Sequence, residues 1–337
     1  MTQPVWASDL PLLLDEVYSA LKAKAPTDPK VKLIDLVEWL RRMPSPSPRR
    51  VHVSDALSGR KILTPYELAG IRQIRQAMAR GHSLRPFMGD RSRSVRRRDG
   101  KASRSGNDLF FADWGLLHFH LGADLANSGR RVMRSRRVLI AHLTEHDAYL
   151  LDVIPHGEGF ADAWGRVELL EILHRNWPDV LGRHELKGMM APAVDDRPSA
   201  MEYVRLREAG INVPIMVDGK AFLGPGGGLS GDGTSTYAVM LADKICDELD
   251  AGERWFREQM GEAEAKLFVR GDATMGYFVE AQDVAFVVWS ARDERLNAPG
   301  LFRRLFAEGV MQVPENAIWT PKIGHLGART AGRANQN

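Results

Sequence analysis

Apolar side chains recur at helical spacing through the first 80 residues of the chain. Three segments show this pattern, and each opens with residues that favour a helix start: Ser8-Asp9, Asp28-Pro29 and Thr64-Pro65-Tyr66-Glu67. Serine, threonine and aspartate cap the free N–H groups of a first turn, and proline is tolerated there. The third start also fits a capping box between Thr64 and Glu67. The pattern predicts an N-terminal helical region over residues 1–84.

The apolar periodicity stops after this region. Residues 85–107 are rich in Arg, Ser and Gly and contain no repeating apolar position. Such a composition is typical of a loop rather than of a packed element. We therefore expect a basic linker or arm over residues 85–107.

Alternating and continuous apolar segments replace the helical spacing further on. Residues 109–121, 138–143 and 148–154 predict strands, the first as one strand or as two short strands around Asp113. A helix is expected over about residues 166–175, where apolar positions return to helical spacing. Together these segments predict a small antiparallel sheet domain with a packing helix, residues 108–185.

The remainder predicts a separate C-terminal α+β domain over residues 190–326. Asp218-Gly219 is a typical hairpin turn, residues 235–249 have helical spacing, and residues 284–289 form an apolar run. The polar tail, residues 327–337, is expected to be disordered. The predicted fold class is α+β.

Composition sets limits on the class of protein. The hydrophobic content of 44% and the charged content of 26% are ordinary for a globular protein. No run of about 18 apolar residues is present, which argues against a membrane span, and no secretory signal is evident at the N-terminus. The single cysteine, Cys246, excludes an intrachain disulfide. These features predict a cytoplasmic protein.

The net charge of +3 is unevenly distributed. Residues 85–137 contain 13 Lys and Arg against 5 Asp. The excess lies in two clusters on either side of residues 116–121: one contains Arg96, Arg97 and Arg98, and the other contains Arg130, Arg131, Arg134, Arg136 and Arg137. A stretch of this kind attracts polyanions, so RNA or another nucleic acid is the expected partner.

Three histidines are the main candidates for chemistry. His118 and His120 lie on one face of the predicted strand at 116–121, opposite Leu117, Phe119 and Leu121. The same parity argument puts Asp152 and His156 together at the end of the segment 148–156. If the two strands are neighbours and the apolar face packs on the core, these four side chains share a water-facing surface.

Such a surface suits the cleavage of RNA phosphodiesters. One imidazole takes the proton of the 2′-hydroxyl group and another protonates the 5′-oxygen. An arginine fork matches the phosphoryl oxygens, and Arg136 and Arg137 are the nearest candidates in sequence. This chemistry needs no metal and no cofactor, so we expect neither.

The stretch from His118 to Phe160 also resembles a known family, the bacterial toxin endoribonucleases of the RelE superfamily, and within it the YafQ branch. The likeness lies in the histidines of the sheet, the strands at 138–141 and 148–153, and the closing His156-Gly157-Glu158-Gly159-Phe160. It covers only residues 108–160 of the 337. The resemblance implies metal-free mRNA cleavage with His156 as the main acid and base. It also implies that His120 matches a central-strand histidine, that Phe160 packs on a base, and that a neutralising protein partner exists.

Alternatives remain open at this point. The chain is either an endoribonuclease, as a toxin or phage-defence effector, or a non-catalytic nucleic-acid-binding or assembly protein. A third interpretation is a metallohydrolase, because His-x-His on a strand is a common ligand pair. Its further ligand would be His142, His146, Asp147, Asp152 or His156. The histidines are inert if they are hydrogen-bonded within the core. The oligomeric state is not predicted.

Overall fold

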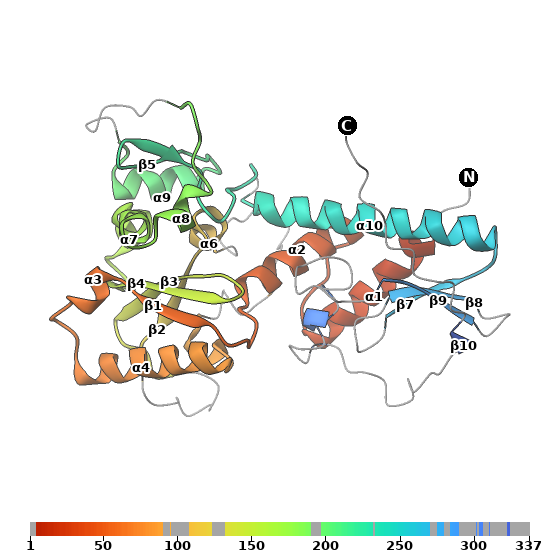
Figure 1. Cartoon of the computed structure of the whole chain (residues 1–337), viewed down its shortest axis with the longest axis horizontal. Coiled ribbons are helices and arrows are strands. Elements are labelled where there is room, and N and C mark those ends of the chain that lie inside the picture. The colour runs from red at the N-terminus through yellow and green to blue at the C-terminus, as the bar shows by residue number, and fades with distance from the viewer. Residues whose placement is uncertain are drawn as a thin grey trace. The chain divides into compact units, whose positions relative to one another are not determined.

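A computed structural model describes most of the chain, namely residues 5–89, 95, 108–122, 132–189, 197–231, 233–269, 275–279, 284–289 and a few short pieces beyond residue 300. Figure 1 labels the elements. The chain divides into two compact units, Met1–Leu33 with Leu241–Asn337, and Ile34–Met240. The predicted α+β fold class is confirmed, since each unit combines helices with a four-stranded sheet.

The larger unit, Ile34–Met240, is built on a mixed sheet in the order β1-β4-β3-β2. Its strands are β1 (Arg50–Val53), β2 (Leu116–His120), β3 (Arg137–Leu143) and β4 (Asp147–Pro155). β2, β3 and β4 are antiparallel, as predicted, whereas β1 runs parallel to β4. The expected all-antiparallel sheet is therefore corrected to a mixed one, because a strand from the predicted helical region joins its edge.

One side of this sheet is covered by α4 (Pro65–Arg80) (Figure 1). The predicted capping box is present: Thr64 accepts from the N–H of Glu67, and the Glu67 carboxylate accepts from the N–H of Thr64. Gly81 ends the helix at φ 70°, a left-handed conformation that glycine adopts without strain. The buried face of α4 contains Ile71, Ile74 and Met78. A complete cap at each end fixes the length of this helix.

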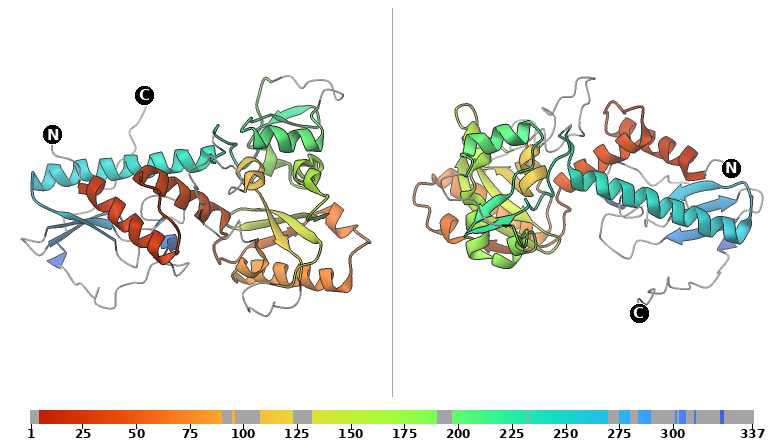
Figure 2. Two further views of the ribbon diagram at one scale, coloured as in Figure 1. Left: turned by 180° about the vertical axis from the view of Figure 1, so that it is seen from behind. Right: turned by 90° about the horizontal axis from the view of Figure 1, so that it is seen from above.

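The other side of the sheet carries α6, α7, α8 and α9 (Figures 1 and 2). Their bounds are Leu109–Trp114, Glu168–Asn176, Pro178–Gly182 and Ala200–Glu208. The short helix η3 (Ala161–Gly165) packs against α9. A hairpin of β5 (Ile215–Val217) and β6 (Lys220–Phe222) turns at the predicted Asp218-Gly219. One apolar core joins these elements to the sheet.

α6 corrects a second prediction, because residues 109–114 were expected to be strand. Asp108 caps the helix by accepting from the N–H of Phe111, and Gly115 ends it at φ 64°. The apolar run of this segment does not by itself distinguish a buried helix from a strand. Asp108 and Gly115 therefore define the two ends of α6, and β2 starts immediately after Gly115.

The smaller unit has its own sheet, in the order β10-β9-β8-β7. The strands are β7 (Lys266–Val269), β8 (Met275–Val279), β9 (Val284–Trp289) and β10 (Lys322–Ile323). α1 (Val5–Ala20) packs beside β7, where Asp9 accepts from the N–H of Leu267 at 2.8 Å. The predicted apolar strand at 284–289 is thus present as β9.

The remaining elements are α2 (Pro29–Arg42), α3 (Asp55–Ser58), η1 (Arg85–Phe87) and α10 (Thr236–Met260). Among the residues that the structure describes, no helix is both long and apolar enough to cross a membrane.

The two units differ from the domain boundaries expected from the sequence. Residues 1–84 do not form a separate domain, because β1 is a strand of the sheet that holds the histidines and α4 packs against it. The expected C-terminal domain is divided, since α9, β5 and β6 pack in the larger unit and residues from Leu241 onward belong to the smaller one. Most of the expected arm, residues 90–94 and 96–107, and the tail, residues 327–337, lie outside the described residues.

Candidate active site

Three imidazole rings converge at one end of the mixed sheet. His118 and His120 come from β2, and His156 directly follows β4, where its N–H donates to the backbone oxygen of Arg136 at 2.8 Å. The ring centroids of His118 and His156 lie 5.8 Å apart, those of His120 and His156 5.1 Å, and those of His118 and His120 5.8 Å. The two histidine strands are not neighbours as expected, because β3 lies between β2 and β4, but the three rings still converge.

The histidines lie on the more enclosed face of the sheet, not on an open floor. Register places His118 opposite Ile140 and His120 opposite Val138, and both apolar partners belong to the core under α6 and α7. The side chain of His118 is 15% exposed, and His120 is only 3% exposed. His156 is partly exposed. Because helices cover both faces, alternation placed the rings together but did not place them in water. Only His156 and part of His118 remain accessible.

Two neighbours of the cluster were not predicted as site residues. The Trp164 ring, on η3, lies 5.1 Å from the His118 ring and 5.3 Å from the His156 ring. The Asp108 carboxylate is 3.9 Å from Nδ1 of His118, too long for a hydrogen bond but close enough for electrostatic attraction. Sequence offered a signal only for Asp108, which immediately precedes the apolar run and caps α6.

Burial lowers the pKa of His118 below its ordinary value of 6.5, against the raising effect of Asp108, and the positive charge of Arg134 lowers it further. Burial also lowers the pKa of His156, with His118 and Arg134 acting in the same direction. Both rings are therefore mainly neutral near pH 7, the form that accepts a proton. The exposed Arg134 is the cation that acts on both rings.

The ring nitrogens of His118 face two different surroundings. A methyl group built on the buried Gly89 would lie 3.5 Å from Nε2 of His118 and 3.6 Å from Nε2 of His120. On the other edge of the ring, Nδ1 of His118 is buried and makes no hydrogen bond to the described residues. Nδ1 of His156 is likewise buried and makes no hydrogen bond to the described residues. Buried ring nitrogens without partners are uncommon and often mark a functional site.

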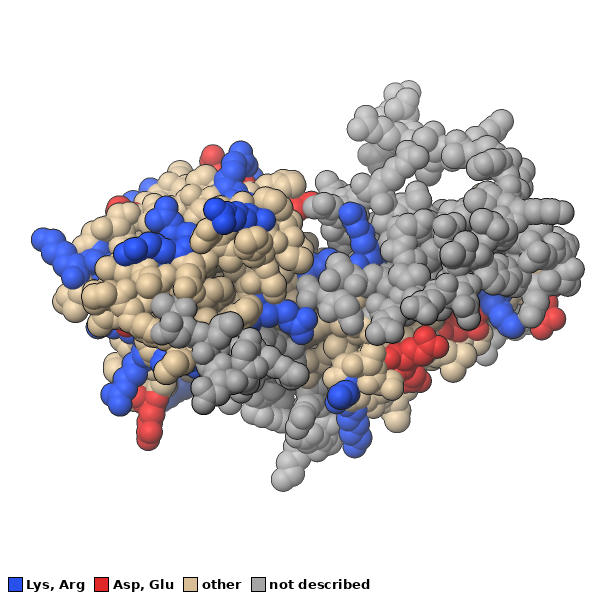
Figure 3. All heavy atoms as spheres, turned by 90° about the horizontal axis from the view of Figure 1, so that it is seen from below, with Lys and Arg blue, Asp and Glu red and all other residues tan. Residues whose placement is uncertain are grey.

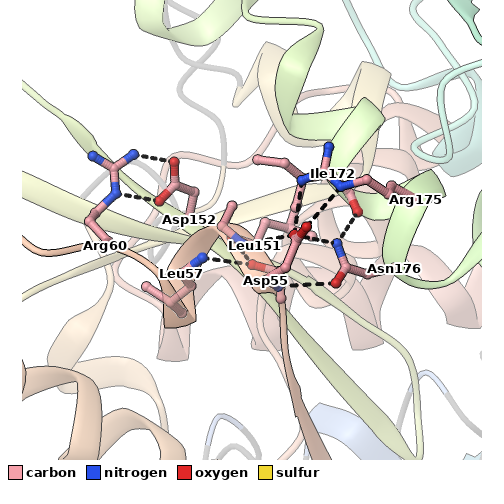
Figure 4. A network of polar contacts seen from close by, with 10 residues as sticks. Asp55, Leu57, Arg60, Leu151, Asp152, Ile172, Arg175 and Asn176 are labelled. Carbon is pink, nitrogen blue, oxygen red and sulfur yellow. Dashed lines mark hydrogen bonds and ion pairs between the residues drawn. The ribbon is translucent and has the colours of Figure 1, made fainter.

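Asp152 does not join the cluster, contrary to the sequence expectation. Its carboxylate accepts two hydrogen bonds from the guanidinium group of Arg60, one from Nε at 2.6 Å and one from Nη2 (Figure 4). Asp152 precedes His156 by four residues, which is ~13 Å along an extended strand. A bulge in β4 at this level and the guanidinium of Arg60 commit the carboxylate to a structural ion pair.

Beside this pair, Asp55 at the start of α3 joins Arg175 and Asn176 of α7 (Figure 4). Asp55 accepts hydrogen bonds from Nε and Nη2 of Arg175, each at 2.9 Å, and from the amide of Asn176 at 2.8 Å. These hydrogen bonds hold the pKa of Asp55 well below its usual range. The network ties α3 to the helix that covers β4.

The predicted phosphate ligands lie in different surroundings. Arg137 donates to the backbone oxygen of Ile62 and contacts the Glu67 carboxylate, so it lies on the α4 side of the sheet, away from the histidines. Arg136 is exposed, and its backbone is bonded to His156. Phe160 is 39% exposed and precedes η3. Arg96, Arg97 and Arg98 lie outside the described residues. Among the described arginines, Arg134 rather than Arg137 acts electrostatically on His118 and His156.

The metal interpretation finds no set of ligands in the described part of the chain. Within that part, no group of three or more His, Cys, Asp or Glu side chains is arranged to hold a metal ion. His142 instead donates from Nδ1 to the backbone oxygen of Gly115 at 3.1 Å, and Asp147 accepts from Arg50 and His52. His146 is exposed in the turn before β4.

Comparisons of this chain with protein-family models, with curated proteins and with solved structures gave no match.

Proposed function

We propose that the chain is a metal-independent endoribonuclease that cleaves RNA by transfer of the phosphoryl group to the 2′-oxygen. The convergence of the His118 and His156 rings, 5.8 Å between centroids, carries this proposal. Both rings have an unpartnered buried nitrogen, the positive charge of Arg134 acts on both, and both retain some exposure. A general base and a general acid that act on one phosphate must lie this close together and must be reachable by the substrate.

His118 is assigned as the base. The carboxylate of Asp108 faces Nδ1 and favours the tautomer with a proton there, which leaves the lone pair on Nε2. Nε2 removes the proton from the 2′-hydroxyl group as its oxygen bonds to phosphorus. Asp108 thus orients the ring and stabilises the imidazolium that forms.

His156 is assigned as the acid, because it is the more exposed of the two rings. In its protonated form it donates a proton to the 5′-oxygen as the bond from phosphorus to that oxygen breaks. The products are a 2′,3′-cyclic phosphate and a free 5′-hydroxyl group. The guanidinium of Arg134 neutralises charge on the phosphoryl oxygens, for which its donor geometry is suited.

His120 and Trp164 support this pair. With 3% exposure, His120 does not reach a phosphodiester, and it holds the two outer rings apart through its edge contacts. The Trp164 ring covers the remaining side of His118 and His156 and keeps water from them. A role as a toxin or phage-defence effector, with a neutralising protein partner, is part of the same proposal and rests on the resemblance alone.

The test uses end-labelled RNA, with and without excess chelator, and four proteins: the native chain, His118→Ala, His156→Ala, and His146→Ala as an exposed-histidine control. We expect cyclic-phosphate ends from the native chain and the control. Each of the other variants should lose roughly 10²–10⁴-fold in rate. Undiminished cleavage by a His118→Ala/His156→Ala double variant would remove these rings from the mechanism. Loss of cleavage on chelation would indicate a metallohydrolase instead.

A non-catalytic RNA-binding protein is the second candidate, favoured by the exposed arginines of α4, Arg72, Arg75 and Arg80. Tight RNA binding by the native chain with no cleavage under any of these conditions would support it over the nuclease.

A further inference from the structure

The outer face of α4 is strongly basic. Ile71, Ile74 and Met78 face the core, and the opposite side of the same helix exposes Arg72, Arg75 and Arg80. At about 100° per residue, Arg75 lies about 60° to one side of Arg72 and Arg80 about 80° to the other, so the three share the broad exposed side of the helix. At 1.5 Å per residue, they span about 12 Å along the helix axis. These three arginines, called the row below, follow the exposed side of α4 from its middle to its last turn.

No acidic side chain of α4 balances this row. Glu67, the acidic residue in its first turn, is buried and is bonded to Thr64 and Arg137. Among the described residues, no carboxylate forms an ion pair with Arg72, Arg75 or Arg80. Figure 3 views this side of the molecule and shows Lys and Arg side chains over the larger unit with few acidic ones between them. A surface with one sign of charge attracts a polyanion.

The first turn of α4 is linked to the segment that carries Arg134. Tyr66, in the first turn of α4, donates a hydrogen bond to the backbone oxygen of Met133 at 2.9 Å. Met133 directly precedes Arg134, whose charge acts on His118 and His156. Arg137 joins the same helix end through Glu67. An RNA strand whose phosphate lies at Arg134 therefore lies near the first turn of α4, and Arg72 follows about 9 Å further along the helix axis from Tyr66.

We propose that the exposed face of α4 binds the phosphate backbone of RNA outside the scissile bond, through Arg72, Arg75 and Arg80. The inference rests on the proposed function for the choice of RNA as ligand. α4 contributes positive charge but no aromatic platform on this face, so the binding is expected to be sequence-independent and strongly salt-dependent. Its role is to hold a long substrate, whereas cleavage occurs at the histidines.

The test compares two triple variants with the same change in charge. Arg72→Gln/Arg75→Gln/Arg80→Gln removes the row, and glutamine keeps a high helix propensity. Arg183→Gln/Lys187→Gln/Arg205→Gln removes three exposed cations elsewhere on the same unit. Binding of a labelled single-stranded RNA is measured by anisotropy over a range of salt concentrations. We expect the first variant to lose at least about tenfold in affinity at low salt, with a salt slope smaller by about 2, and the second to lose far less.

A second readout separates this inference from the proposed nuclease. A dinucleotide is too short to occupy both the histidines and α4, so its cleavage should be equal in the native chain and the first variant. If dinucleotides are not cleaved but the first variant loses RNA binding, the α4 site stands and the nuclease fails. If dinucleotides are cleaved but both triple variants bind RNA alike, the α4 site is overturned and the nuclease stands. Tighter binding of a polyglutamate peptide than of RNA also overturns it.

Discussion

Arg207 donates a hydrogen bond from Nη1 to the backbone oxygen of Trp164 at 2.7 Å. Its Nε also donates to the Asp113 carboxylate at 2.9 Å, and its guanidinium lies 4.5 Å from the centre of the Trp114 ring. One buried arginine of α9 thus joins α6 to η3, the short helix that places Trp164 against His118 and His156. Burial raises the pKa of Asp113 despite this partner, so the pair depends on a dry, closely packed setting.

We predict that Arg207→Lys displaces Trp164 without breaking the ion pair. A lysine ammonium retains the charge opposite Asp113 but lacks the fork that serves Asp113 and the Trp164 oxygen at the same time. The rate constant kcat should fall by up to roughly 10²-fold with little change in KM, because the catalytic rings lose their positioning. The pKa values of His118 and His156, followed by NMR of the ring protons, should rise toward 6.5 as their shielding from water is lost.

The matched control is Arg166→Lys, at a half-exposed arginine that directly follows η3 and pairs with Asp162 of that helix. It should leave kcat and both pKa values unchanged. A lower melting temperature in Arg207→Lys, with unaltered histidine pKa values and unaltered kcat, would show that Arg207 serves stability alone.

Gly89 gives a second prediction, because a methyl group added there lies at van der Waals distance from Nε2 of His118 and of His120. Gly89→Ala should fold normally, and its methyl group would lie against Nε2 of His118, the atom proposed to accept the hydroxyl proton. We expect cleavage to fall by about 10²-fold, comparable with the loss of one proton-transfer group. Gly182→Ala is the control, since a methyl group there meets no atom within 4 Å. Full activity in Gly89→Ala would place proton transfer elsewhere than at Nε2 of His118.

The pH dependence of cleavage follows from the two lowered histidine pKa values. Cleavage needs one neutral and one protonated ring, so kcat/KM rises with pH through the lower pKa and falls through the higher one. Both pKa values lie below 6.5 in the free protein, so the optimum lies on the acid side of 6.5. Initial rates from about pH 4.5 to about pH 8.5 should decline along the alkaline limb. A level profile above pH 7 would contradict proton donation by His156.

Much of the larger unit could be predicted because its signals are local. The capping box at Thr64 and Glu67 and the buried stripe of α4 both depend on residues that are close together in the sequence. The strands β3 and β4 are likewise continuous apolar segments. β1 was not predicted, because its four residues become a strand only by pairing with Asp147–Leu150 of β4, far away in sequence.

The candidate site was predictable only in part. Alternation placed His118 and His120 on one face, and that parity holds. It does not predict that helices cover both faces of the sheet, so that the histidine face of β2 is buried as well as the apolar face. Arg60 captures Asp152 and Trp164 covers the histidines through contacts between residues far apart in sequence. The sequence of β2 or β4 alone therefore does not predict those contacts.

His142 carries a final prediction, on stability rather than on cleavage. Burial lowers its pKa from 6.5 to about 4, although its Nδ1 donates to the Gly115 oxygen. In the unfolded chain this histidine takes up a proton below pH 6.5, whereas in the folded chain it stays neutral until about pH 4. Stability is therefore complete above pH 6.5 and is lost as the pH falls toward 4, by roughly 3 kcal/mol from this residue.

The measurement is urea denaturation of the native chain and of His142→Gln at about pH 7 and about pH 4.5. Glutamine retains a donor for Gly115 but does not titrate, so the variant should lose less stability on acidification than the native chain. Because His118 and His156 contribute in the same direction, the difference between the two proteins isolates His142. The exposed His146→Gln serves as the control and should match the native chain. Equal acid destabilisation of all three proteins would mean that His142 is already protonated, or hydrated, in the folded state.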